Sequence, residues 1–334
     1  MTTAIIGAGI AGLSAARVLE AAGETVRLYD KGRGPGGRMS TRRAETPVGE
    51  ARWDHGAQFF TARDEAFREE IVRLREAGAV TRWRPRMADI RKRSDSWTVG
   101  VQPSENEREP LFVGTPSMNA VIKAMATDLP IDWGRRVTKI RLDGQHKTLV
   151  FEDGGEEGPF DKVICATPAE QAVDLLSGVS DALSAQAARA QSAPCWAVML
   201  AFKEKLPVDW DAANIADGAL GWVTRNASKP DRGDTETWVL HASPAWSREH
   251  VDLEKDDVMA QLLREFSTMS GAPEPIHVAA HRWLHAKVDK AAGSSFGWDE
   301  ATGIAVIGDW RSGPRVEAAW LSGLACADFL SSAK

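Results

Sequence analysis

Short apolar runs alternate with helix-like stretches near the two ends of this chain. Residues 3–6 form an apolar run that leads into a glycine-rich turn and a helix-prone segment at 13–20, and a second apolar run follows at 25–29. Further apolar runs lie at 160–168 and 303–309. Strands that alternate with helices in this way are typical of βαβ units, so the pattern predicts an α/β fold.

The middle of the chain has a different pattern. Runs at 194–202, 221–225 and 235–242 are rich in apolar, β-branched and aromatic residues and are separated by polar turns. Such runs predict a sheet. Residues 251–269 then carry apolar positions at helical spacing, which predicts a helix behind that sheet.

These patterns predict two domains. We expect a discontinuous cofactor-binding domain, with a smaller mixed-sheet substrate domain inserted into it, and a substrate site between the inserted sheet and the cofactor. The cofactor-binding domain is expected to comprise residues 1–75, 115–170 and 276–334. The substrate domain is expected to comprise residues 76–114 and 171–275.

Composition narrows the class of protein. The 334 residues, 43% of them hydrophobic, are enough for two domains with a substantial core. No apolar run approaches the roughly 20 residues of a membrane span, and the chain starts with a strand rather than a signal peptide. Its three cysteines lack C-x-x-C spacing, which favours neither disulfides nor a cysteine zinc site. We therefore expect a cytoplasmic protein with no metal site, no membrane contact and no obligate protein partner.

The formal charge of −6 argues against a general nucleic-acid-binding protein. One local exception is the basic segment at 81–93. It is interpreted either as a solvated face, which we favour, or as a docking surface for substrate phosphates.

A dinucleotide-binding motif opens the chain. Gly7, Gly9 and Gly12 form G-x-G-x-x-G between the first strand and the first helix. The first glycine allows the tight turn, the second lets a pyrophosphate approach the backbone, and the third permits close helix–strand packing. The helix start at Ile10 and Ala11 offers free N–H groups to phosphate oxygens. Other candidate contacts follow the second strand, where Asp30 is expected to accept from a ribose hydroxyl and is followed by Lys31.

A second glycine-rich loop favours FAD over NAD. Gly36, Gly37 and Arg38 form the core of a loop where a plain NAD domain would continue into its next helix, and this loop resembles the second phosphate-contacting element of FAD-dependent amine oxidases and their relatives. The guanidinium of Arg38 matches phosphate oxygens in shape and charge. The alternative is a solvated basic loop.

Later segments supply further candidate cofactor contacts. Val137 lies where flavoproteins of this kind hold the adenine through backbone groups, and Thr167 lies in an Ala-Thr-Pro segment that ends an apolar strand. Asp309 also ends a strand, and its carboxylate can bind the ribitol chain. The final helix begins near three residues whose N–H groups can point at the pyrimidine edge of the flavin and stabilise a reduced anionic ring. They are Arg315, Val316 and Glu317.

At this point the sequence resembles the bacterial renalase family over nearly its full length. The glycine motifs are shared by many flavoproteins, whereas residues 56–63 (Gly-Ala-Gln-Phe-Phe-Thr-Ala-Arg) and 225–230 (Arg-Asn-Ala-Ser-Lys-Pro) are more specific. The resemblance implies a fold like p-hydroxybenzoate hydroxylase and monoamine oxidase, with non-covalently bound FAD. It also implies oxidation of the 2- and 6-dihydro isomers of NAD(P)H. Hydride would pass to flavin N5, NAD(P)+ would leave, and O2 would reoxidise the flavin to give hydrogen peroxide.

The resemblance also implies candidate catalytic residues. Asn226 and His241 match polar positions that face the substrate in that family, and Trp283 lies in a family motif as a candidate pocket wall. Gln58, after Gly56 and Ala57, is expected near the flavin ring. Hydride transfer from a dihydropyridine needs no strong general base, because the product gains aromaticity. A site of Asn, His and Trp is consistent with that reaction.

Alternatives remain for these residues and for the function. Asn226 could be a turn residue, His241 could be a structural histidine at a strand end whose hydrogen bonds are made within the protein, and Gln58 could cap backbone groups. The main alternative function is a flavin-containing amine oxidase of the same fold, although 334 residues is short for that group. A second alternative is a flavin-binding sensor protein without turnover.

Overall fold

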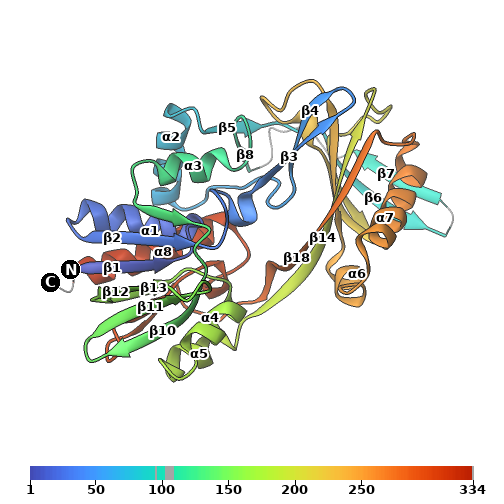
Figure 1. Ribbon diagram of the computed structural model, residues 1–334. Helices are drawn as coiled ribbons and strands as arrows, with labels where there is room; N and C mark the ends of the chain where they lie inside the picture. Colours follow the sequence, from blue (N-terminus) through green and yellow to red (C-terminus); the bar gives the residue numbers. More distant parts are fainter. Residues whose placement is uncertain (95, 102–108, 333–334) are drawn as a thin grey trace.

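The computed structural model describes residues 1–94, 96–101 and 109–332. Figure 1 shows two parts side by side, one built on a helix-flanked sheet that contains β1 and the other on a larger sheet that contains β14 and β18. The first sheet has six strands in the order β19-β20-β13-β1-β2-β9. Its pairs are parallel, except that β19 and β20 are antiparallel. Its strands are β1 (Thr2–Ile6), β2 (Thr25–Asp30), β9 (Ile131–Trp133), β13 (Lys162–Cys165), β19 (Gly297–Asp299) and β20 (Ile304–Val306).

Helices and a small sheet cover the two faces of this six-stranded sheet. One face packs into a core with the first and last helices, which contact each other closely, and with two further helices from the first half of the chain. The other face packs against a three-stranded antiparallel sheet and two short helices. The first group is α1 (Ile10–Ala21), α2 (Glu65–Glu76), α3 (Ala120–Ala126) and α8 (Val316–Ser332). The second is β10 (Val137–Asp143), β11 (His146–Phe151), β12 (Glu156–Phe160), α4 (Ala169–Leu176) and α5 (Asp181–Ala187).

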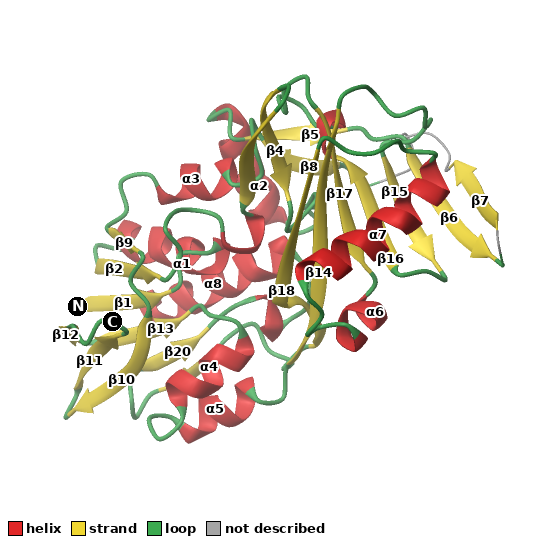
Figure 2. Ribbon diagram, turned by 45° about the vertical axis from the view of Figure 1, so that its right-hand side comes forward, coloured by secondary structure: helices red, strands yellow, loops and turns green. Residues whose placement is uncertain are grey.

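The second large sheet has seven strands in the order β18-β14-β17-β16-β15-β6-β7. Only β15 and β6 pair in parallel within this sheet, so it is mixed. Helix α7 lies across this sheet, and the two together bury a separate hydrophobic core (Figure 2). Its elements are β6 (Met87–Arg93), β7 (Ser96–Val101), β14 (Gln191–Phe202), β15 (Ala212–Ala216), β16 (Leu220–Arg225), β17 (Glu236–Ala242), β18 (His277–Lys290), α6 (Pro244–Glu249) and α7 (Lys255–Ser270).

Two short antiparallel strand pairs and three 3-10 turns complete the elements named here. The antiparallel strands β3 (Thr41–Thr46) and β4 (Gly49–Asp54) leave the six-stranded part, and Trp53 of β4 donates to the carbonyl of Leu200 on β14 at 2.8 Å. Another antiparallel pair consists of β5 (Val80–Trp83) and β8 (Leu111–Gly114). The 3-10 turns are η1 (Gly37–Met39), η3 (Asn226–Ser228) and η4 (Asp309–Arg311).

The predicted fold class is confirmed, because a Rossmann-type α/β sheet stands beside a mixed sheet. The domain boundaries stay a prediction, and one strand lies differently from expectation. Residues 277–290, expected in the cofactor-binding part, form β18, which pairs with β14 over most of its length in the seven-stranded sheet. In the basic segment, β6 buries Met87, Ala88 and Ile90, whereas residues 91–93 are exposed.

Candidate active site

The glycine-rich turn has the geometry that a pyrophosphate needs. Gly7 has a φ of +105°, and a Cβ at Gly12 would lie 2.0 Å from the carbonyl oxygen of Gly7, so neither position tolerates a side chain. A Cβ at Gly9 would meet nothing within 4 Å. The backbone of Gly9 is therefore open for close approach of a ligand at the start of α1.

Asp30 ends β2 beside this turn, as predicted. One of its carboxylate oxygens accepts from the N–H of Ala8 at 2.7 Å, and the other accepts from the N–H of Gly32 at 2.6 Å. The carboxylate thus orders the turn, and its contact with a ribose stays a prediction. The adjacent Lys31 donates to the side chain of Gln171 at 3.3 Å, and burial lowers its pKa.

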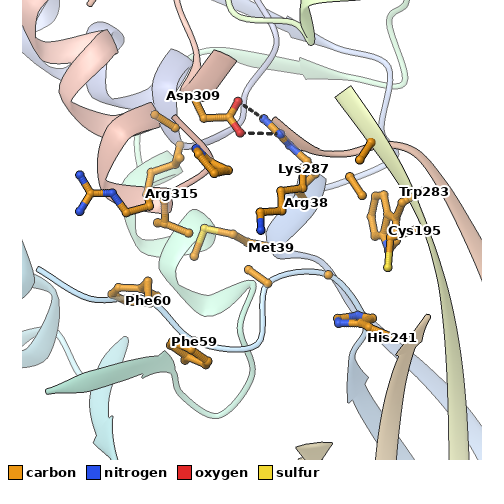
Figure 3. Close-up of a pocket in the computed structure, with 18 of the residues that line it drawn as sticks. Arg38, Met39, Phe59, Phe60, Cys195, His241, Trp283, Lys287, Asp309 and Arg315 are labelled. Carbon is orange, nitrogen blue, oxygen red and sulfur yellow. Dashed lines mark hydrogen bonds and ion pairs between the residues drawn. The ribbon is translucent and has the colours of Figure 1, made fainter. Parts of the chain in front are cut away.

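Two predicted cofactor residues from opposite ends of the chain meet. Arg38 of η1 makes two hydrogen bonds to Asp309 of η4, at 2.7 and 2.6 Å (Figure 3). The carboxylate is 9% exposed and the guanidinium 35%, so the pair lies at a partly open wall. Both residues line the same cavity.

This cavity has a volume of about 820 Å³ and lies between the six-stranded part and the seven-stranded sheet, since residues of both line it. Many of the predicted residues line it, from both parts of the molecule. They are Gly9, Ile10, Ala11, Arg38, Gly56, Ala57, Thr167, His241, Trp283, Asp309, Arg315 and Val316.

Thr167 offers an independent sign that the cavity holds a ligand. Its hydroxyl oxygen is buried and has no hydrogen-bond partner within the described part of the chain, although the residue lines the cavity. Buried hydroxyls are normally paired, so a polar ligand atom is the natural partner. With the open backbone at Gly9, this hydroxyl fits the phosphate and ribitol groups of FAD.

One wall of the cavity is built around a single backbone carbonyl. The carbonyl oxygen of His55 accepts from the indole N–H of Trp283 at 3.0 Å and lies 3.0 Å from Nε2 of His241. The His55 ring stacks on Trp283 with centroids 5.1 Å apart. Burial lowers the pKa of both His55 and His241 to about 4, so both imidazoles are neutral near pH 7.

Asn226 and Gln58 lie apart from this wall. Asn226 is fully buried; its amide donates to the carbonyl of Arg52 at 2.8 Å and accepts from the N–H of Asp54 at 3.2 Å. Gln58 is also buried and donates to the carbonyls of Asp54 and Gly56. Neither is among the described residues that line the cavity. The structure thus places both as supports of the 52–58 backbone, which lines the cavity at Gly56 and Ala57.

A buried ionic cluster underlies this segment, and sequence analysis missed it. One carboxylate oxygen of Asp54 accepts from Lys229 at 3.2 Å and from Arg232 at 3.0 and 2.7 Å. Lys229 also donates to Gln58 at 3.1 Å. Burial alone would raise the pKa of Asp54, but the two cations lower it to about 2, and burial lowers the pKa of Lys229 to about 8. The two most family-specific sequence segments, 56–63 and 225–230, are therefore joined by this cluster.

Two further residues predicted to contact the cofactor, Val137 and Glu317, are buried and are not among the described residues that line the cavity. Val137 begins β10 and is buried outside the lining of the cavity. Glu317 is buried in the first turn of α8, where one carboxylate oxygen accepts from the N–H groups of Arg63 and Asp64 and the other pairs with Arg315 at 3.0 Å. Whether backbone N–H groups of this turn contact a flavin stays a prediction.

Further residues that were not predicted individually also line the cavity. Arg63 makes a two-pronged ion pair with Glu109 at the cavity, with contacts of 2.7 to 3.0 Å. Other lining residues are Phe59, Phe60, Cys195, Trp222 and Lys287. The segment 56–63 pointed to the phenylalanines and Arg63, whereas nothing local in the sequence indicated Cys195 or Lys287.

A Rossmann-type sheet with two glycine-rich turns, and a second sheet across a cavity, is the arrangement typical of a dinucleotide-binding flavoprotein. The profile of the NAD(P)-binding Rossmann-like domain matches residues 5–73, and that of the flavin containing amine oxidoreductase family matches residues 90–330. The chain belongs to the flavin containing amine oxidoreductase family, and its cofactor is FAD. It is thus an FAD-dependent oxidoreductase.

Solved structures with little sequence identity share the fold. Cyclohexylamine oxidase from Brevibacterium oxydans IH-35A has a TM-score of 0.78 at 14% identity, with 99% of each chain covered. Wild-type putrescine oxidase bound to putrescine has a TM-score of 0.74 at 14% identity, again with 99% of each chain covered. An oxidoreductase from Methanosarcina mazei has a TM-score of 0.71 at 15% identity, covering 98% of this chain and 100% of that one. Within the residues described here, no helix is long and apolar enough to cross a membrane.

Proposed function

We propose that this protein is a renalase-like oxidase of the 2- and 6-dihydro isomers of NAD(P)H, which releases NAD(P)+ and passes the electrons to O2. The observation that carries the proposal is the charge of the cavity lining. The two carboxylates among the described lining residues, Asp309 and Glu109, are each held by an arginine. A protonated amine would find no free carboxylate there, whereas the phosphates of a dinucleotide would find the cation Lys287 in the lining.

The wall around His241 suits the proposed chemistry. Bound FAD supplies a two-electron acceptor whose reduced form reacts with O2. A dihydropyridine that loses hydride becomes an aromatic cation and needs no base to take a proton. Neutral His241 and the indole of Trp283, both anchored to the His55 carbonyl, would hold the flat ring in one orientation.

Amine oxidation is the second candidate. The family match and the aromatic lining favour it, since Phe59 and Trp222 pack with ring centroids 5.6 Å apart and offer the cavity an apolar surface on which an uncharged amine could lie.

Anaerobic stopped-flow measurement of flavin bleaching distinguishes the candidates. The yellow holoenzyme is mixed separately with 6-dihydro-NAD, ordinary NADH and a benzylic amine. We expect rapid bleaching by the 6-dihydro isomer and slow or no bleaching by the other two. Bleaching by the amine alone would replace the proposal with amine oxidation, and no bleaching by any of them would refute both.

A variant tests the charge argument directly. Lys287→Met should raise the half-saturating concentration of 6-dihydro-NAD about threefold, the effect of losing a partly solvated ion pair. Lys290→Met, three residues further along β18 and exposed, is the matched control. Equal effects of the two variants would contradict the assignment of Lys287 to substrate phosphates.

A further inference from the structure

The proton on His241 has a fixed position. A carbonyl oxygen can only accept hydrogen bonds, so the 3.0 Å contact between Nε2 of His241 and the carbonyl oxygen of His55 requires the proton on Nε2. Trp283 donates to the same oxygen and occupies its second lone pair. The carbonyl thus holds the ring with Nε2 toward the protein backbone.

The other ring nitrogen is therefore a hydrogen-bond acceptor. Burial, together with the charge of Lys229, lowers the pKa of His241 to about 4, so the imidazole is neutral in any buffer near pH 7. A neutral imidazole protonated on Nε2 carries a lone pair on Nδ1. Within the described part of the chain, Nδ1 of His241 has no hydrogen-bond partner, and the residue lines the cavity.

The cavity lining offers a carboxylate at this nitrogen little compensating charge. Cys195, Trp222 and Ala242 line the same cavity as His241, and none of them carries a positive charge. Lys229, whose charge acts on His241, is not among the described lining residues and is paired with Asp54. Burial raises the pKa of the Cys195 thiol to about 12, and its sulfur lies 3.7 Å from the carbonyl oxygen of Ala242, so the thiol stays protonated and donates away from a ligand. Figure 3 shows His241, Cys195 and Trp283 on one side of the cavity. Lys287 lies four residues beyond Trp283 on β18, about 13 Å along the strand.

We propose that Nδ1 of His241 is an acceptor-only contact that selects a substrate bearing a primary carboxamide and rejects the corresponding carboxylate. An amide N–H can donate to this lone pair, whereas a carboxylate would bring a second lone pair and a buried negative charge against it. The inference rests on the proposed function for the identity of the ring. It adds that the cavity discriminates between nicotinamide and nicotinic acid forms of the dinucleotide.

The test compares an amide and an acid that differ at this group only. Anaerobic reduction of the holoenzyme is measured with the 6-dihydro isomers of NAD and of nicotinic acid adenine dinucleotide. We expect the second-order rate constant for the amide to exceed that for the acid by on the order of 100-fold, because a site built around one hydrogen bond rejects ligands that cannot form it. In His241→Gln the ratio should fall below about fivefold, since a glutamine amide can turn its NH2 toward a carboxylate. His146→Gln, at an exposed histidine of β11, should keep the wild-type ratio.

A binding titration keeps this inference separable from the proposed function. Oxidised wild-type holoenzyme is titrated with NAD+ and with nicotinic acid adenine dinucleotide while the flavin spectrum is followed, which requires neither turnover nor a variant. Tighter binding of NAD+ supports the acceptor contact even if neither dihydro isomer bleaches the flavin, an outcome that would sink the proposed function alone. Equal binding of the two dinucleotides, or equal reduction rates with the amide and the acid in the wild type, would overturn the inference.

Discussion

Replacing Asp54 by asparagine should destabilise the protein strongly, because Asp54 is the only carboxylate in contact with Lys229 and Arg232 among the described residues of their buried cluster. All three side chains are buried, and the carboxylate also accepts from the N–H of Met118 and the hydroxyl of Thr41. In Asp54→Asn, two buried cations would share a neutral amide. The loss of a buried partner of this kind costs about 3–5 kcal/mol.

The pKa of Asp54 gives an independent magnitude. The cations lower it from 3.8 to about 2, and a shift of about 2 units corresponds to about 2–3 kcal/mol at about 1.4 kcal/mol per unit. Since the pKa is lower in the folded than in the unfolded protein, this contribution is fully present above about pH 4. It is lost as the pH falls from about 4 to about 2.

The assay is urea-induced unfolding followed by circular dichroism at pH 7. We expect the free energy of unfolding of Asp54→Asn to fall by about 3–5 kcal/mol. Asp153→Asn, which breaks an exposed pair with Arg135, should change it by less than about 1 kcal/mol. The double variant Asp54→Asn/Lys229→Met should be more stable than Asp54→Asn, because it removes one stranded cation. A loss no larger than that of Asp153→Asn would show that this cluster does not stabilise the fold through its charges.

Three further predictions concern the cofactor. Gly12→Ala should yield protein without FAD, because its Cβ would lie 2.0 Å from the carbonyl oxygen of Gly7. Gly9→Ala should fold normally and bind FAD more weakly. The A450/A280 ratio of each purified variant measures how much FAD it retains. Thr167→Val should weaken FAD binding about 5- to 10-fold, the value of one hydrogen bond, and Thr167→Ser should retain the affinity of the wild type, as measured by titration of the apoprotein. Equal affinities of the valine and serine variants for FAD would exclude a role for the hydroxyl. Acid precipitation should release all the flavin into the supernatant, because the pKa of the Cys195 thiol in the cavity lining is raised to about 12, which leaves almost no thiolate to form a covalent bond to the flavin. Flavin retained in the pellet would disprove non-covalent binding.

Local motifs allowed the cofactor region to be predicted from the sequence. The turn at Gly7, the strand ends at Asp30 and Asp309, and the loop at Arg38 are each defined by residues that are neighbours in the chain. Their chemistry depends on backbone geometry over a few positions. Strand ends of a parallel sheet meet at one edge, so residues that follow Asp30 and β20 were expected near one another, whereas the direct pair between Arg38 and Asp309 was not predicted.

Only the tertiary structure could decide which of the candidate substrate-binding side chains face the cavity. The family resemblance made both Asn226 and His241 candidates, yet the amide of Asn226 is hydrogen-bonded to the backbone of β4, whereas His241 lines the cavity. A side chain in this region faces the cavity or a backbone group according to which distant segment packs against it, and no local pattern records that choice.

By itself, then, the sequence determined the α/β class, FAD as the cofactor and the presence of a second sheet, because these depend on periodicity, local motifs and short-range spacing. The tertiary structure alone decided that β18 joins the seven-stranded sheet, that Asp54 meets Lys229 across 175 positions, and that one carbonyl, at His55, sets the proton of His241. These contacts arise from the packing of segments far apart in the chain. Polar groups that become buried need hydrogen-bond partners, and these partners come from the distant segments that the fold packs against them.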